Sequence, residues 1–280
     1  MTEDIMQEGA SVNDLQNPAL LIGFRNEIGG VAGGVYDFLR NKASLKRIGS
    51  LNLQDYFTFD GVAVENDTIQ FPDCGFYAWS EGNLLFYWGD VPHRNPYEYT
   101  SAILDISVNE YHSQEVITLG GFVAPISHLS PRRVFGTVTQ ADLRLLLEPY
   151  DVNLDINYQT PSGGARPSMN HFLLWNAQQH QIAGYSLWVE VPFYLANVKD
   201  PKGTRTLLDV LDQRFALGFD LRPVEEEVEQ VNQGIELIKK GNPDISRYLG
   251  LLEQGIALSQ EEGEKLAQEV IGFFHKRSHN

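Results

Sequence analysis

The sequence predicts an α/β protein: a mixed sheet flanked by helices, with a C-terminal helical extension. Three observations indicate this class. Short, continuously apolar runs such as 19–24 and 115–119 are typical of strands buried on both faces of a sheet. A glycine-bearing turn and a helical pattern over 31–42 follow the first run, as at the start of an α/β unit. Partly alternating segments between 61 and 88 indicate antiparallel strands, so the sheet is mixed.

Local patterns predict the first half of the body. Alternating apolar residues around polar turns indicate two hairpins, which extend the sheet in the antiparallel direction. Apolar residues at helical spacing indicate a helix, and a short apolar run after it indicates a central strand that ends in Gly120-Gly121. In chain order we expect a strand over 47–51, hairpins within 61–71 and 76–88, a helix over 97–111 and a strand over 115–119.

The second half of the body continues the alternation of strands and helices. In chain order we expect a strand over 134–138, a short helix over 140–147, a helix over 169–180, a strand over 182–191 and a helix that begins at Asp200-Pro201. Asp200 suits the N-cap of that last helix, because its carboxylate can accept a hydrogen bond from a free backbone N–H, and Pro201 suits the first helical position.

The chain divides into three segments. Residues 1–17 carry four acidic and no basic residues and lack periodicity, so we expect a disordered N-terminal tail. The α/β domain covers 18–222. From residue 223 the composition becomes Glu-rich, and 223–280 is expected to form three short amphipathic helices, the last starting at a capping box over 259–262. They should pack on the body, on each other or on a neighbouring subunit.

Composition excludes several classes of protein. The 280 residues carry a formal charge of −16, which repels phosphate backbones, so nucleic acid is not an expected partner. A single cysteine, Cys74, can form neither an internal disulfide nor a Cys-based zinc site. The sequence contains no apolar run of about 18 residues, so we expect a cytoplasmic protein with no membrane partner.

Glycines at two strand ends suggest a pocket. Gly29 and Gly30 lie between the first strand and its helix, where backbone amides could receive an anion. Their spacing matches neither a dinucleotide-binding fingerprint nor a P-loop, and the alternative is that they let the helix approach the sheet closely. Gly120 and Gly121 follow a central strand at the sheet edge where α/β proteins bind ligands.

Further polar residues could complete this pocket. His128 and Arg133 follow the second glycine pair, and the arginine could otherwise pair with surface carboxylates. Ser162 lies in a Gly-rich loop without the G-x-S-x-G pattern, so it is not assigned as a nucleophile. The complete set of candidate pocket residues is Gly29, Gly30, Gly120, Gly121, His128, Arg133, Ser162, Gly163 and Glu190. We expect no catalytic residue, metal site or cofactor, because dispersed carboxylates and histidines show no ligand spacing.

A dense aromatic cluster lies in the second hairpin. Its members could form part of the core, or they could form a subunit or partner interface, because amphipathic rings suit both. The candidate interface residues are Phe76, Tyr77, Trp79, Phe86, Tyr87 and Trp88.

Read in order, several segments over 18–222 resemble the proteasome assembly chaperone 2 family, whose archaeal and bacterial members are mostly uncharacterised and are sometimes catalogued as ATP-grasp enzymes. The segments that carry the resemblance are Leu21-Ile22-Gly23-Phe24 with the turn 29–34, Phe76-Tyr77-Ala78 with the hairpin to Gly89, 116–121, 124–128 with 131–136, 186–194 and Asp200-Pro201-Lys202.

The resemblance implies a phosphorylase/hydrolase-like domain that forms homo-oligomers and works by binding other proteins. Some archaeal relatives dock on the proteasomal α-ring through a hydrophobic-Tyr-X tail. This chain ends in 276–280, Lys-Arg-Ser-His-Asn, which speaks against proteasome binding. Glu27-Ile28-Gly29 stands where the family has Asp-Ala-Gly.

Two functional hypotheses follow. The first is a non-enzymatic, homo-oligomeric interaction or assembly-chaperone-like protein. The alternative is a small-molecule-binding protein or enzyme of nucleoside-phosphorylase/hydrolase-like fold, with its pocket at the carboxyl ends of the strands.

Overall fold

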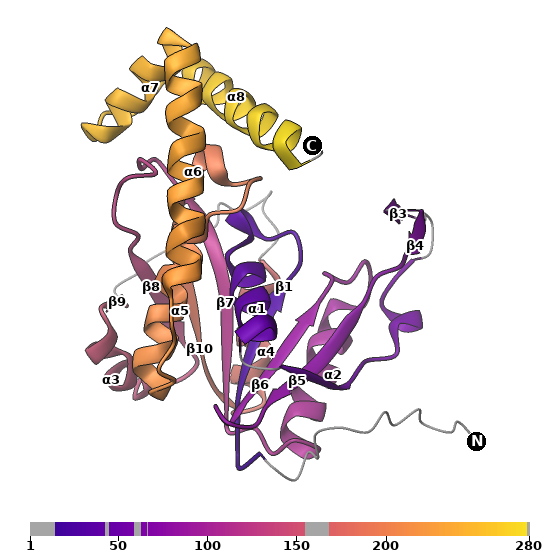
Figure 1. Cartoon of the computed structure of the whole chain (residues 1–280). Helices are drawn as coiled ribbons and strands as arrows, with labels where there is room; N and C mark the ends of the chain where they lie inside the picture. Colours follow the sequence, from indigo (N-terminus) through magenta and orange to yellow (C-terminus); the bar gives the residue numbers. More distant parts are fainter. Residues whose placement is uncertain (1–14, 43–44, 59–62, 66, 155–167, 279–280) are drawn as a thin grey trace.

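The computed structural model describes residues 15–42, 45–58, 63–65, 67–154 and 168–278. Eight strands form one sheet (Figure 1). In spatial order they are β2 (Lys46–Gly49), β5 (Cys74–Trp79), β6 (Leu84–Gly89), β1 (Ala19–Phe24), β7 (Glu115–Ala124), β10 (Ala183–Pro192), β8 (Val134–Val138) and β9 (Val152–Asn153). The mixed α/β architecture that the sequence predicts is confirmed.

The centre of the sheet is parallel, each flank joins it through an antiparallel pair, and the edge pair β8–β9 is parallel again. β1 pairs in parallel with β6 and β7, and β7 pairs in parallel with β10. β5 and β8 run antiparallel to β6 and β10. All six residues of β1 are buried, as expected of a strand covered by helices on both faces.

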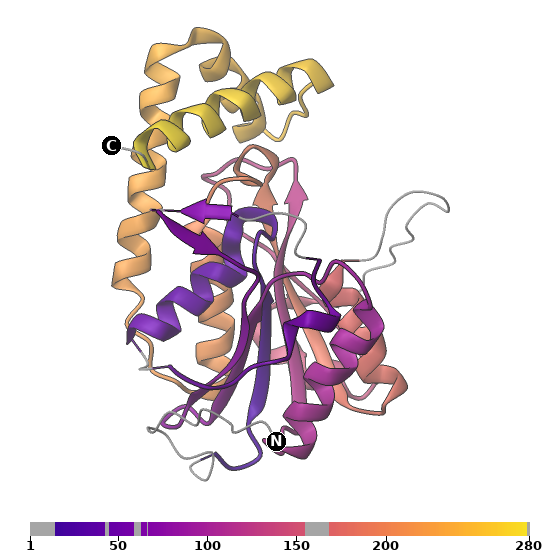
Figure 2. The ribbon, with the colours of Figure 1, turned by 90° about the vertical axis from the view of Figure 1, so that its right-hand side faces the viewer.

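Helices cover both faces of the sheet. α1 (Val31–Lys42) and α5 (Pro201–Phe215) lie on one face, whereas α2 (Pro96–Asn109) and α4 (Met169–Gln179) lie on the other (Figure 2). A short helix, α3 (Leu143–Leu147), lies between β8 and β9 in the chain. Each face has its own cluster of buried apolar side chains, because successive strand residues point to opposite faces.

Two predicted strand boundaries and the placement of one hairpin are wrong. β7 does not end in Gly120-Gly121 but continues to Ala124, since both glycines stay in register with Trp188 and Val189 of β10. β3 (Ala63–Glu65) and β4 (Thr68–Gln70) form the expected hairpin, but it is a separate two-stranded sheet rather than an extension of the main one. The strand expected over 47–51 is β2, which ends at Gly49.

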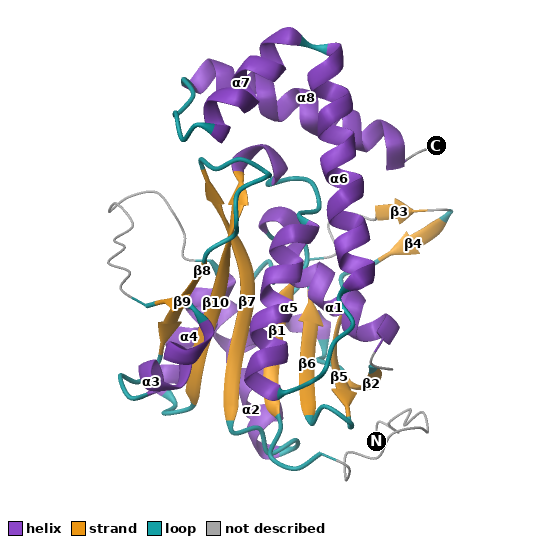
Figure 3. Cartoon of the chain, turned by 60° about the vertical axis from the view of Figure 1, so that its left-hand side comes forward, coloured by secondary structure: helices purple, strands orange, loops and turns teal. Residues whose placement is uncertain are grey.

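The C-terminal segment forms α6 (Arg222–Gly241), α7 (Pro243–Glu253) and α8 (Gln260–Ser278) (Figure 3). The backbone N–H of Glu262 donates to the Ser259 hydroxyl, and the Ser259 N–H donates to the Glu262 carboxylate, so the predicted capping box forms. α6 packs on α5, and α8 packs on the turn 193–195 and on α6. Buried side chains of all three helices belong to the same cluster as those of α1 and α5.

The aromatic cluster lies inside the chain. Phe76, Tyr77, Phe86, Tyr87 and Trp88 are buried, and Trp79 is half-buried. The Trp88 ring stacks on Tyr36 of α1 with centroids 5.0 Å apart, and the Trp79 ring stacks on Phe219 at 5.7 Å. Phe76, Tyr77, Phe86, Tyr87 and Trp88 are therefore core residues, the first of the two interpretations, whereas for the half-buried Trp79 the interface interpretation stays a prediction.

Candidate functional site

Glu27 lies at the carboxyl end of β1, in the turn whose backbone amides are one candidate for binding an anion. Its Oε1 accepts a hydrogen bond from the backbone N–H of Ala32 in the first turn of α1, with an O–N distance of 2.6 Å. Its Oε2 accepts from the backbone N–H of Gly121 in β7 at 2.9 Å. The amides that could receive an external anion are thus bound to a carboxylate of the chain itself.

Burial shifts the titration of this carboxyl group. Desolvation raises the pKa of Glu27 to about 7, and the backbone N–H groups of Ala32, Gly121 and Val31 act in the opposite direction. The group therefore titrates near neutral pH, well above an ordinary glutamate.

The glycines serve close packing. Gly29 has φ +70°. Its N–H donates to the carbonyl of Ala196, and its carbonyl accepts from the N–H of Asp200, each at 2.8 Å. A Cβ on Gly29 or on Gly121 would lie 2.9 Å from a methyl group of Val191. Of the two interpretations, close approach to the sheet accounts for Gly29, whereas a Cβ on Gly30 would meet only Lys199 Cγ at 3.8 Å.

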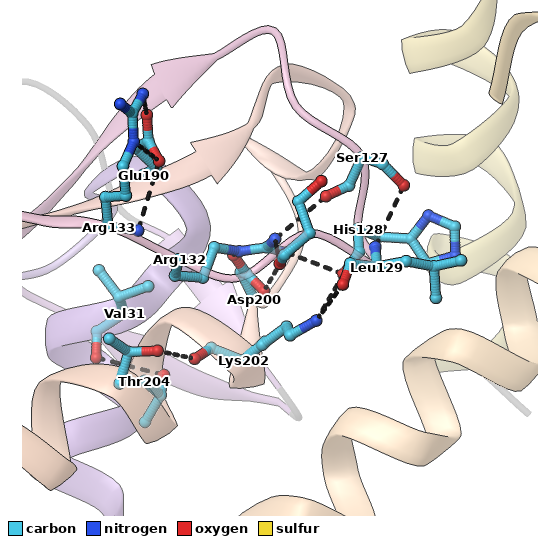
Figure 4. A network of polar contacts seen from close by, with 12 residues as sticks. Val31, Ser127, His128, Leu129, Arg132, Arg133, Glu190, Asp200, Lys202 and Thr204 are labelled. Carbon is cyan, nitrogen blue, oxygen red and sulfur yellow. Dashed lines mark hydrogen bonds and ion pairs between the residues drawn. The ribbon is translucent and has the colours of Figure 1, made fainter. Parts of the chain in front are cut away.

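Arg132 and Asp200 form a buried ion pair beside this turn. The Arg132 Nε lies 3.0 Å from Asp200 Oδ2, and both side chains are 1% exposed. Arg132 Nη1 also donates to the carbonyls of Ser127 and Ser130 at 3.1 and 2.8 Å (Figure 4). Asp200 and Pro201 occupy the predicted N-cap and first helical position of α5, but the Asp200 side chain makes no capping hydrogen bond, because its carboxylate is bound to Arg132.

His128 lies beneath the C-terminal helices. Its Nδ1 is 3.0 Å from the hydroxyl of Tyr194, while Nε2 is buried and finds no hydrogen-bond partner among the described residues. Burial, together with the charges of Lys239 and Arg132, lowers the pKa of His128 to about 4, although Glu236 opposes the shift. The imidazole is therefore neutral at physiological pH.

Arg133, directly before β8, pairs with Glu190 of the neighbouring strand β10. Arg133 Nη2 and Nε donate to the two Glu190 oxygens at 2.6 and 3.0 Å, a bidentate arrangement. The guanidinium is exposed and lies 5.4 Å from the centre of the Phe135 ring. The alternative interpretation of this arginine is pairing with a surface carboxylate; it does pair with a carboxylate, but the partner, Glu190, is buried.

The structure brings the candidate pocket residues together only in part. Gly29 and Gly121 meet at Val191, and Arg133 meets Glu190, but His128 belongs to a different group of contacts with Tyr194. Gly120 lies in β7 against the side-chain amide of Asn170, which donates to the carbonyl of Leu119 at 2.7 Å. Gly30 lies in the turn before α1 and has φ +55°. Ser162 and Gly163 lie outside the described residues.

Sequence reasoning missed the side chains that hold this edge together. They are Glu27, Asp200 as the ion-pair partner of Arg132, Asn170 and Tyr194. Glu27 had a detectable signal: it is the first acidic residue after a buried strand and directly precedes a glycine turn. Among the described residues, no three His, Cys, Asp or Glu side chains are grouped as metal ligands. The described helices include none with both the length and the apolar composition needed to cross a membrane.

A family model described as the PAC2 family matches residues 20–239. This chain belongs to the PAC2 family. The resemblance expected from the sequence is thereby confirmed, and the PAC2 match extends beyond residue 222 into α6. No curated protein matches this PAC2 chain.

Solved structures show the same fold as this PAC2 protein. Pyrococcus furiosus PbaB, described as an archaeal proteasome activator, is 21% identical, with 84% of this chain and 97% of that chain covered and a TM-score of 0.67. A Mycobacterium tuberculosis proteasome-assembly chaperone homologue is 16% identical, with coverages of 82% and 99% and a TM-score of 0.67. A Corynebacterium glutamicum protein of unknown function is 16% identical, with coverages of 90% and 94% and a TM-score of 0.70.

Proposed function

We propose that this PAC2 protein is an assembly-chaperone-like protein: it acts by binding other polypeptides, and copies of the chain associate with one another. Family membership supports this function, because similar structures include a proteasome activator and a proteasome-assembly chaperone homologue. We place the protein in the cytoplasm, and its charge of −16 disfavours nucleic acid as a partner.

The observation that carries the proposal is the internal pairing of polar groups at the carboxyl edge of the sheet. Glu27 binds the Ala32 and Gly121 amides, Arg132 binds Asp200, and Arg133 binds Glu190. A small-molecule site needs donors and acceptors that converge on open space. Groups that are bound to one another instead hold the turn before α1, the loop 127–132 and strand β10 in place, as suits a rigid scaffold for protein contacts.

Two measurements on the purified full chain test the proposal. Light scattering at micromolar concentration is expected to give a multiple of the chain mass, and a monomer would contradict self-association. Thermal unfolding with nucleosides, nucleotides and metabolites at about 1 mM is expected to leave Tm within about 1 °C. A ligand that raises Tm by several degrees in the wild type but not in Arg133→Met would overturn the proposal in favour of the small-molecule alternative.

Affinity capture from the native cytosol with chemical crosslinking then identifies the partner. We expect a polypeptide in stoichiometric amount that wild type and Arg133→Met retain equally, because the proposal gives Arg133 a pairing role with Glu190 and no contact with the partner. If the captured protein loses this polypeptide only when a metabolite is removed from the cytosol, binding of the partner depends on a ligand.

A further inference from the structure

An exposed aromatic surface lies across α2 and α4. Tyr97 of α2 contacts Phe172 and Trp175 of α4, with ring centroids 6.5 and 6.3 Å apart, and the two α4 rings stack at 5.6 Å. Tyr97 is 42% exposed and Trp175 is 47% exposed. We call these three residues the aromatic patch. Figure 2 shows α4 (salmon) on the side of the sheet opposite α1 (indigo).

The fold does not need these rings for its core. The opposite side of α4 supplies the buried residues Leu173, Leu174 and Ala177. Asn176 holds α4 against α2 by donating to the hydroxyls of Thr100 and Ser101 at 2.8 and 3.0 Å. The rings are therefore fixed in position while large parts of them face solvent, a combination typical of contact surfaces.

The helix that carries the patch is uncharged. α4 contains no Asp, Glu, Lys or Arg, in a chain with 37 acidic and 21 basic residues. Its first-turn histidine, His171, stacks on Trp188 with centroids 4.2 Å apart, and burial lowers its pKa, which favours the neutral ring. Glu98, which follows Tyr97 on α2, is exposed.

We propose that the aromatic patch binds the aromatic patch of a second copy of this chain across a twofold axis. This inference rests on the self-association in the proposed function and names its surface. Two chains of charge −16 repel each other, and contact through an uncharged helix brings the fewest like charges together. A basic partner would gain nothing from this face, because acidic surfaces would attract it instead.

The position of the rings along α4 suits such an axis. α4 spans Met169–Gln179, so its centre is Leu174, and Trp175 is the exposed residue next to that centre. A twofold axis through the middle of the helix places Trp175 against its own copy, with Phe172 and Tyr97 beside it. The same patch then serves both subunits, as a closed dimer contact requires.

Sedimentation velocity on the full chain and two variants tests the proposal. Trp175→Glu places two like charges at the axis and is expected to weaken the dimer at least about 30-fold. Leu237→Glu is the matched control, because Leu237 on α6 is 51% exposed and lies outside the patch. It is expected to leave dimerisation unchanged, and circular dichroism checks that both variants are folded.

The dependence of dimerisation on salt concentration provides a second test of the aromatic patch. Raising NaCl from about 0.05 M to about 0.5 M is expected to tighten the wild-type dimer, because salt screens the repulsion between the acidic chains and an aromatic contact has no ion pairs to lose. If the oligomer persists in Trp175→Glu, or dissociates at high salt, the aromatic patch is not the contact between subunits. The proposed function would then still stand, because the chains do associate. A wild-type monomer at about 100 µM in both salts would overturn the surface together with self-association.

Discussion

At the residue scale, Glu27 and His128 are buried titratable groups whose pKa values move in opposite directions. Burial raises the pKa of Glu27 to about 7 and lowers the pKa of His128 to about 4. In both cases desolvation penalises the charged form, so each group shifts toward its neutral state. Because one is an acid and the other a base, their contributions to the free energy of unfolding change with pH in opposite directions.

Glu27→Gln is expected to remove a contribution that weakens as pH rises. Between its ordinary pKa near 4.5 and the folded value near 7, the folded chain binds more protons at Glu27 than the unfolded chain. This stabilisation is complete below about pH 4.5 and is lost by about pH 7. From about pH 5 to about pH 7.5, the stability of wild type relative to the variant should fall by roughly 2 kcal/mol, measured by urea unfolding. Glu226→Gln, at an exposed position, serves as the control. A stability difference between wild type and Glu27→Gln that does not change with pH would contradict the expectation.

His128→Gln is expected to give the opposite slope in the same experiment. The unfolded imidazole binds a proton near pH 6.5, whereas the folded one stays neutral down to about pH 4. The stability of wild type relative to the variant should therefore fall by roughly 2 kcal/mol on going down from about pH 7.5 to about pH 5. If the stability of wild type relative to His128→Gln instead rose on acidification, the buried ring would bind a proton in the folded state.

At the element scale, glycine decides how closely α1 and α5 approach. A Cβ on Gly34 of α1 would overlap the side chain of Thr204 on α5. Thr204 Oγ1 already donates to the carbonyl of Val31 at 3.4 Å, so the threonine has little room to move. The close contact of these two helices thus depends on the absence of one methyl group.

Gly34→Ala is expected to destabilise the protein by about 1–3 kcal/mol, because the overlap with Thr204 outweighs the better helix propensity of alanine. Gly250→Ala is the matched control in α7, where no described atom lies within 4 Å of the added Cβ. There only helix propensity acts, so we expect a gain of up to about 1 kcal/mol. Thermal unfolding that shifts in the same direction for both variants would contradict the packing argument.

At the scale of the whole molecule, the C-terminal helices and the body share one core. Leu266 and Val270 of α8 and Ile235 of α6 are fully buried in the same cluster as residues of α1 and α5. His128 and Tyr194 lie between the sheet edge and these helices. The extension should therefore unfold together with the body.

Leu266→Ala is expected to lower the free energy of unfolding by about 2–5 kcal/mol and to move the whole transition. The four tryptophans, Trp79, Trp88, Trp175 and Trp188, all lie in the body, so their fluorescence reports the body alone. Far-ultraviolet circular dichroism also reports the helices of the extension. The two signals should coincide in wild type and variant, and an earlier loss of helical signal would show that the extension unfolds separately.

Local patterns determined much of the architecture in advance. The apolar run 19–24, the helix over 31–42 and the capping box at Ser259 lie where the sequence predicts them. These features depend on neighbours a few residues apart, whose spacing is visible in the sequence. The same patterns placed the end of β7 too early, because whether a strand continues through glycines depends on pairing with β10.

Tertiary structure alone decided which side chains meet. Glu27 and Gly121 are 94 positions apart and Arg132 and Asp200 are 68 apart, and no local pattern specifies such pairs. The sequence could not show which aromatic rings face solvent, those of β5 and β6 or those of α2 and α4. Residue type sets how strongly a ring prefers burial, but the packing of the elements sets which rings are covered. Here packing covers the hairpin rings and leaves Tyr97 and Trp175 exposed.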